Sequence, residues 1–294
     1  MKMFDPHIHM TSRTTDDYQA MSDAGIAAII EPAFWLGQPR THVGSFEDYF
    51  LGLLGWERFR ASQFGIRHYA TMGLNPKECN NPEVADGVID LVRLYAEKDG
   101  VVAIGEIGYD DQTEAEDKYF AEQIEIAKEY ELPILIHTPH RDKKNGTIRT
   151  IERVKELGFP MELTLIDHNN EETLPYTLEC GAWAGHSIYP NTKMDEGRMV
   201  ALVQQYGSDR IIINSAADWG VSDPLKVPKT VAAMREAGID DDVITTIVWN
   251  NPVRFFAQSG RLDETEVQTK VSVDQTQLFE GNSVLRGQKP VVDA

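Results

Sequence analysis

Six histidine and carboxylate side chains, groups that bind zinc, manganese and iron, stand where apolar runs of the sequence end. His7 and His9 are two residues apart, so in an extended strand both side chains project to one side and could ligate one ion. The others follow separate apolar runs: Glu106, His137, His168 and Asp218. A His-x-His pair arises easily by chance, but six such groups at strand ends together indicate a metal centre.

These groups can meet only if the elements that carry them end at one edge. Short apolar runs, as required by parallel strands buried on both faces, recur eight times along the chain. We expect strands over residues 3–8, 27–31, 66–72, 101–107, 133–137, 163–168, 182–187 and 210–214.

Stretches of helical period separate the strands. Residues 116–130 place Phe120, Ile124 and Ala127 at helical spacing, with charged residues on the other faces. Weaker helical patterns cover residues 84–97, 148–157, 199–206 and 228–237. Eight strands alternating with helices over about 250 residues predict an α/β fold, a single (β/α)8 TIM barrel with its active site at the carboxyl ends of the strands. A doubly wound open sheet is the alternative.

The length suits one barrel domain over residues 1–260, followed by a C-terminal extension over residues 261–294, where the apolar period fades. The extension could wrap a neighbouring subunit, so a homo-oligomer stays open. Residues 34–60 exceed a bare crossover and are rich in glycine and aromatics. We expect them to decorate the mouth of the barrel as a lid or a partner surface.

The charge balance argues against polyanionic partners. The 294 residues include 28 Lys and Arg against 47 Asp and Glu, a net charge of −19, which disfavours nucleic acid and anionic membranes. Two cysteines suit free thiols in a reducing compartment, and no apolar run approaches the ~20 residues of a membrane span. We therefore expect a cytoplasmic protein with no membrane span.

Several motifs resemble the TatD-like branch of the metal-dependent amidohydrolase superfamily, in order over residues 1–258. Residues 4–9, Phe-Asp-Pro-His-Ile-His, resemble its opening Asp-x-His-x-His, and residues 105–110, Gly-Glu-Ile-Gly-Tyr-Asp, are close to its Gly-Glu-Ile-Gly-Leu-Asp. Residues 73–76 and 251–256 are similar to its Gly-x-His-Pro and its closing Asn-x-x-Arg-x-Phe. Residues 31–40 and 137–144 together look like a subgroup encoded in natural-product and metabolite-export gene clusters.

The resemblance implies an amidohydrolase-like barrel with two divalent ions, which could be Mn, Zn, Fe or Mg. In the family pattern, His7, His9 and Asp218 hold the first ion, Glu106 bridges both, and His137 with His168 holds the second. A metal-bridging hydroxide would be the nucleophile. Asp218 would take the nucleophile's proton and deliver it to the leaving group, so Asp218 and Glu106 are the expected catalytic residues.

The sequence departs from the family around the expected substrate. Asn75 stands where the Gly-x-His-Pro motif has histidine, and residues 215–220, Ser-Ala-Ala-Asp-Trp-Gly, replace Thr-Asp-Ala-Pro. The loop at residues 169–172 also differs. The metal groups are kept while their surroundings change, so the resemblance supports the metal chemistry more than a substrate.

A second tier of residues could contribute to the site. Glu31, which ends the second strand, is an extra ligand, an acceptor for a histidine N–H, or a structural carboxylate. His140 and His186 are further candidates for metal binding or ligand support. For the substrate, Arg141 could clamp a phosphate or carboxylate, with Asn75 and Trp219 beside it. A solvated loop and packing at the barrel rim are the alternatives.

The leading functional hypothesis is a divalent-metal-dependent hydrolase, with a binuclear centre, that cleaves a phosphoester, amide or ester bond of a small anionic metabolite. One alternative is a 3′ to 5′ exonuclease or DNase, against which the charge of −19 argues. A second is a metal-binding scaffold without turnover. A third is a metal-assisted isomerase or lyase, since the same barrel can stabilise an enolate.

Overall fold

Eight parallel strands in sequence order form the centre of the protein, for which a computed structural model describes residues 1–271. They are β1 (Met3–Asp5), β2 (Ile26–Pro32), β3 (Arg67–Met72), β4 (Val101–Gly108), β5 (Ile134–His137), β6 (Thr164–Ile166), β7 (Trp183–Ser187) and β8 (Ile211–Asn214). A strand is present at each of the eight predicted places, but β1 and β6 are shorter than predicted, because β1 ends at Asp5 and β6 at Ile166. Their order is that of a (β/α)8 barrel rather than a doubly wound sheet.

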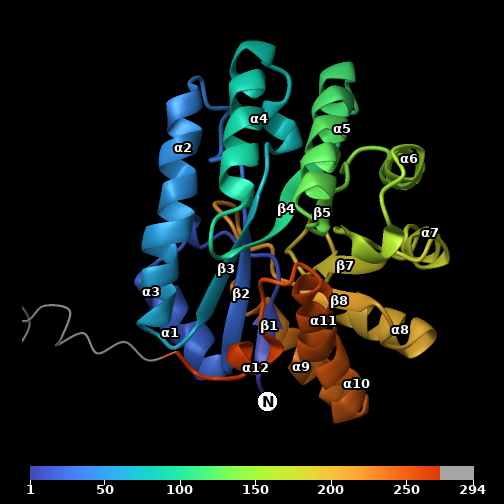
Figure 1. The fold of residues 1–294 in the computed structure, drawn as a ribbon. Coiled ribbons are helices and arrows are strands. Elements are labelled where there is room, and N and C mark those ends of the chain that lie inside the picture. The colour runs from blue at the N-terminus through green and yellow to red at the C-terminus, as the bar shows by residue number, and fades with distance from the viewer. Residues whose placement is uncertain (272–294) are drawn as a thin grey trace, which may run out of the picture.

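Helices surround the strands (Figure 1). The α-helices are α1 (Thr15–Ala24), α2 (Val43–Leu51), α3 (Arg58–Ser62), α4 (Pro82–Ala96), α5 (Glu114–Glu129), α6 (Lys143–Glu156), α7 (Leu174–Glu179), α8 (Glu196–Tyr206), α9 (Lys226–Glu236), α10 (Asp241–Thr245), α11 (Asn251–Ala257) and α12 (Glu264–Val267). Short 3-10 or π segments are η1 (Met10–Ser12), η2 (Gly52–Glu57), η3 (Pro76–Glu78), η4 (Met161–Leu163) and η5 (Thr246–Asn250). The five predicted helices are confirmed as α4, α5, α6, α8 and α9. No helix within residues 1–271 is long and apolar enough to cross a membrane.

The expectation that residues 34–60 decorate the barrel mouth is wrong for most of the segment. Residues 43–62 form α2, η2 and α3, which run continuously as the crossover between β2 and β3. Figure 1 shows α2 beside α4, and Phe46 and Phe50 of α2 are buried in the same apolar cluster as α4 side chains. Aromatic residues at helical spacing here build the helix layer, because they pack against the neighbouring helix.

The barrel interior is a separate apolar cluster. It takes side chains from all eight strands, among them Phe4, Leu135 and Ile212, and adds Trp249 and Phe255 from η5 and α11. Val267 of α12 belongs to the same cluster, so residues up to 267 pack back onto the barrel. The division into a domain over residues 1–260 and an extension over residues 261–294 stays a prediction, since residues 272–294 lie outside the described part.

The segments just beyond β8 and β1 join the two ends of the strand order. The Ala216 backbone N–H donates to the His7 carbonyl at 2.8 Å, and the His9 N–H donates to the Ala217 carbonyl at 2.9 Å. The Ser215 N–H donates to Oδ1 of the buried Asp5 at 3.1 Å. These hydrogen bonds form a seam, which therefore runs through the His7 and His9 segment.

The Asp5 carboxyl gives the metal-free protein a measurable pH dependence. Burial raises the pKa of Asp5 to about 7, above its value in the unfolded chain, so the native state holds a proton that the unfolded state releases. The contribution of Asp5 to the free energy of unfolding is therefore full below about pH 4 and is lost as the pH rises to about 7. In urea titrations of chelator-treated protein, Asp5→Asn should remove this decline. Parallel curves for wild type and variant would contradict the assignment.

Candidate metal centre

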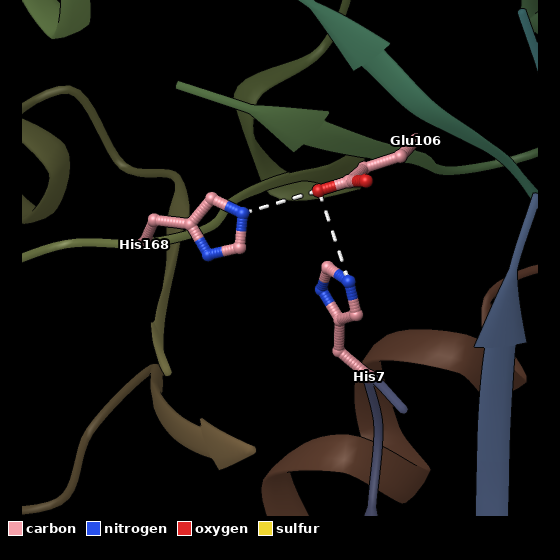
Figure 2. Close-up of side chains that lie close together, drawn as sticks. All are labelled: His7, Glu106 and His168. Carbon is pink, nitrogen blue, oxygen red and sulfur yellow. Dashed lines mark hydrogen bonds and ion pairs between the residues drawn. The ribbon is translucent and has the colours of Figure 1, made fainter. Parts of the chain in front are cut away.

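Glu106, near the carboxyl end of β4, lies at the centre of a buried cluster of imidazoles. Its Oε1 atom is 2.9 Å from His137 Nδ1, 3.1 Å from His168 Nε2 and 3.7 Å from His7 Nε2. Figure 2 shows the side chains of His7, Glu106 and His168 pointing toward one another. One ligand atom from each of these three lies within 4.8 Å of the others. Such a buried set of nitrogen and oxygen donors suits a divalent metal ion.

Two further histidines complete the cluster. His9 Nε2 lies 3.0 Å from His7 Nε2, and His137 Nδ1 lies 3.2 Å from His168 Nε2. All four histidines and Glu106 are at most 5% exposed. The structure thus brings together five of the six residues predicted as ligands, as two histidine pairs beside one carboxylate.

The protonation of this cluster fits metal ligands. Burial lowers the pKa of His9 and His168 well below the usual value, so both are neutral imidazoles with a free lone pair. Burial alone would raise the pKa of Glu106, but His137 and His7 hold it well below its usual range. Burial alone would lower the pKa of His137, yet Glu106 and Asp110 raise it. A positive charge is therefore favoured beside Glu106, where a metal ion would supply it.

Asp218, the sixth predicted ligand, makes its hydrogen bonds elsewhere. Its Oδ1 accepts from the Tyr189 hydroxyl at 2.8 Å and from the Gly220 backbone N–H at 2.9 Å. Asp218 is half-buried, in the loop after β8. Among residues 1–271, none of its hydrogen bonds joins it to Glu106 or to the four histidines.

A carboxylate that the sequence did not single out, Asp167, contacts the cluster instead. Its Oδ2 accepts a hydrogen bond from His7 Nδ1 at 2.5 Å, and its Oδ1 accepts from the His168 backbone N–H at 2.7 Å. Asn214 Nδ2 donates to both oxygens, at 3.0 and 3.1 Å. This contact fixes the His7 ring and leaves its Nε2 facing Glu106, as carboxylates behind metal-binding histidines do. The signal in the sequence was an aspartate directly after a run of apolar strand residues.

Other polar side chains hold the ligands from behind. Asn75, predicted to bind substrate, donates from Nδ2 to Glu106 Oε2 at 2.9 Å. Ser187 Oγ lies 2.7 Å from His168 Nδ1. Phe34 stacks on the His9 ring with 3.8 Å between centroids. The rings of His7, His9 and His168 and the Glu106 carboxylate therefore each have a side-chain contact that orients them before any ion binds.

Two of the remaining predicted residues are Glu31, which bonds to residues outside the cluster, and His140, whose ring contacts it. Glu31 is buried, with Oε2 2.8 Å from His68 Nε2 and Oε1 accepting from the Thr11 N–H. His140 is exposed and stacks over His168 with 6.0 Å between ring centroids.

Three further predicted residues lie elsewhere. His186 is buried, and neither ring nitrogen has a hydrogen-bond partner within residues 1–271. The Arg141 side chain is 93% exposed, 3.9 Å from Asp111. Trp219 is 56% exposed.

A (β/α)8 barrel with buried histidines and a carboxylate at the strand ends defines a metal-dependent hydrolase of the amidohydrolase type. Residues 4–257 match the TatD related DNase family, so the chain belongs to the TatD family. This membership, and the predicted barrel, are confirmed.

Individual relatives agree with this assignment. The chain is 27% identical over 257 residues to an uncharacterized metal-dependent hydrolase of Methanocaldococcus jannaschii, covering 86% of this chain and 99% of the relative. A crystal structure of a TatD-like protein from Archaeoglobus fulgidus matches with a TM-score of 0.71 at 25% identity, over 86% of this chain and 99% of that one. The phosphotriesterase homology protein of Escherichia coli shares the fold with a TM-score of 0.63 at 14% identity, over 87% of this chain and 98% of that one.

Removing the central carboxylate should remove the metal. We expect protein purified without chelators, or reconstituted with Mn²⁺, Zn²⁺ or Fe²⁺, to hold metal, and Glu106→Gln to lose most of it, because an amide cannot supply the negative charge that offsets the cations. Elemental analysis gives the metal-to-protein ratio. Glu83→Gln, an exposed position on α4, is the matched control. Equal metal in both variants would contradict the role of Glu106.

Asp167 should tune metal affinity through His7. Asp167→Asn keeps the size of the side chain but removes the charge that makes His7 a stronger ligand, so we expect about 10- to 100-fold weaker metal binding. Competition with a fluorescent chelator measures the affinity. An unchanged affinity, with an unchanged circular dichroism spectrum, would show that Asp167 acts in packing alone.

Proposed function

We propose that the protein uses two divalent ions to hydrolyse a phosphoester, amide or ester bond of a small anionic metabolite. The observation that carries this proposal is the pairing of histidines on either side of Glu106 Oε1. His7 with His9 would hold one ion and His137 with His168 the other. Glu106 would contact both, because its Oε1 lies within 3.7 Å of nitrogens from both pairs.

Divalent ions in such a site would activate water near neutral pH and polarise the bond to be cleaved. The protein's own residues hold the metal ligands in fixed orientations. Asp167 and Ser187 orient the His7 and His168 rings, and Asn75 fixes the second oxygen of Glu106. This preorganisation is what hydrolysis requires, since ligand rings that rotated freely would misplace both the water and the substrate.

A carboxylate must also move the proton between water and leaving group. Asp167 is fully buried, with both oxygens occupied by His7, His168 and Asn214, so it positions the site rather than titrating during turnover. Asp218 is half-buried, and its hydrogen bonds fall on Oδ1. Burial lowers the pKa of Lys193, and the charges of Glu106 and Asp218 both act against this effect. This supports a position for Asp218 near Lys193, on the same side of the metal centre. We therefore keep Asp218 as the proton-transfer group.

The DNase in the family name makes nuclease activity the second candidate. A net charge of −19 weakens it, because an acidic surface repels a polynucleotide and leaves few counterions to release. A scaffold without turnover would bind metal and cleave nothing.

A substrate panel separates these three functions. Metal-loaded protein is assayed on chromogenic phosphoesters, esters, lactones and amides, and on single-stranded DNA with nucleotide release as the readout. We expect turnover of small substrates and little release from DNA. Release from DNA faster than from every small substrate would favour the nuclease, and metal binding with no turnover would favour the scaffold.

The proton-transfer role of Asp218 makes its own prediction. Asp218→Asn should lower kcat at least about 100-fold on whichever substrate is cleaved, because general acid–base catalysis contributes about 10²- to 10⁴-fold, while metal content stays near that of wild type. The control is Asp209→Asn, an exposed aspartate in the loop that precedes β8. A kcat within about threefold of wild type would remove Asp218 from the mechanism.

A further inference from the structure

A small cavity adjoins the metal centre on the His168 side. Its volume is about 130 Å³, and it is lined by the segments after β5, β6 and β7, including the first turns of α6 and α8. The lining includes His140, Lys143, His168, Asn169, Lys193 and Arg198. Typical ligand pockets measure about 300 to 1,000 Å³, so this cavity suits one functional group of a substrate rather than a whole molecule.

The cavity contains two ammonium groups with no carboxylate partner. Lys143 Nζ donates to the Thr138 hydroxyl at 2.5 Å and to the Thr138 carbonyl at 3.3 Å, and both acceptors are uncharged. Lys193 Nζ lies 5.1 Å from the centroid of the Tyr189 ring. Among residues 1–271, no carboxylate lies within 4.0 Å of either ammonium. By contrast, Arg198 is paired with Glu171 through two contacts of 2.7 and 2.6 Å.

Holding these two charges together costs free energy in the unliganded protein. Burial, together with the nearby Lys193 charge, lowers the pKa of Lys143 to about 7. Burial also lowers the pKa of Lys193. The carboxylates that offset this effect at Lys193 are Glu106, Asp167 and Asp218. Two of these, Glu106 and Asp218, are ligands or catalytic groups of the proposed centre, so their charge is shared with the metal site.

We propose that Lys143 and Lys193 bind a terminal phosphate of a small substrate, with the bond to be cleaved lying over the adjacent metal centre. This inference rests on the proposed function and specifies its substrate class. Two ammonium groups match a dianion, whereas a carboxylate would neutralise only one of them. The His140 ring, stacked over His168, lines the same cavity, and a neutral imidazole carries one N–H donor.

The same cavity replaces the clamp expected at Arg141. Arg141 is 93% exposed beside Asp111, and it does not line the cavity. Lys143, two residues later, is the first residue of α6 and does line it. Lys193 approaches from the loop after β7, where Tyr189 also contacts Asp218. One loop thus connects the phosphate site with the proton-transfer group.

Inorganic phosphate is the probe for this site. It is titrated calorimetrically at neutral pH into metal-loaded wild type, Lys143→Met, Lys193→Met and the double variant. We expect each single variant to weaken phosphate binding at least 10-fold and the double variant to weaken it further. Lys144→Met is the matched control, because Lys144 is exposed, lies next to Lys143 and does not line the cavity. Unchanged Kd values in the lysine variants would place phosphate on the metal ions alone and overturn the proposal.

Two further measurements keep the test decisive. Sulfate should compete with phosphate at least 10-fold better than acetate does, and equal competition would overturn the assignment to a dianion. The melting temperature of each unliganded variant should be no lower than that of wild type, because the substitution removes a half-buried charge that has no carboxylate within 4.0 Å among residues 1–271. A clear drop in melting temperature would mark the lysines as structural, and Lys193→Gln then repeats the phosphate titration in a second background.

The outcomes also distinguish this site from the proposed function. Turnover of small substrates with lysine-independent phosphate binding would keep the hydrolase and overturn the subsite. Lysine-dependent phosphate binding without turnover of any substrate would keep the subsite and overturn the hydrolase. If both hold, a phosphorylated substrate should show a higher KM in Lys193→Met, while its unphosphorylated analogue should not.

Discussion

The structure depends on one electrostatic constraint, which is that Glu106 is ionised in a place almost without water. A buried carboxylate is stable only if cations or hydrogen-bond donors surround it. Imidazoles approach Oε1 and Asn75 donates to Oε2, so both oxygens are satisfied. The imidazoles need partners in turn, and Asp167 and Ser187 supply them. At the strand ends, Glu106 is therefore surrounded by histidines, and these are held by a second group of polar residues. The apolar barrel interior is a separate cluster.

Much of this arrangement was predictable because strands buried on both faces must be apolar. Runs such as residues 101–107 and 133–137 have the length and apolar composition of such strands, and a polar residue near the carboxyl end of each run was therefore expected at the barrel mouth. Strand alternation predicted that His7 and His9 would meet, and their Nε2 atoms are 3.0 Å apart, although both residues lie just beyond β1, which ends at Asp5. Asp167 was missed because its partner, His7, is 160 positions away, and no local pattern records such a contact.

Loop positions were harder to predict than strand positions. The location of Asp218 depends on the path of the loop after β8 and on a hydrogen bond from Tyr189 in another loop. The helix over residues 43–51 carries Phe46, Tyr49 and Phe50 at helical spacing, but its aromatics and Gly44 also fit an irregular lid. Lys193 carries no signal by itself, because its isolation from carboxylates is a property of three loops together. The loop residues that we propose to contact the substrate therefore could not be identified from sequence patterns.

The seam between β8 and β1 has a consequence for the order in which the protein folds. Ser215 bonds to Asp5 across 210 positions of sequence, and residues 216 and 217 bond to the backbone of His7 and His9. Contacts of such long range form late, because a long loop must close before they yield any stability. During synthesis, His7 and His9 emerge about 200 residues before β8, but the backbone hydrogen bonds that hold them can form only after the segment beyond β8 has been made. Metal would therefore bind tightly only after the barrel is complete. A truncated chain ending before residue 211 would lack the backbone partners that hold His7 and His9.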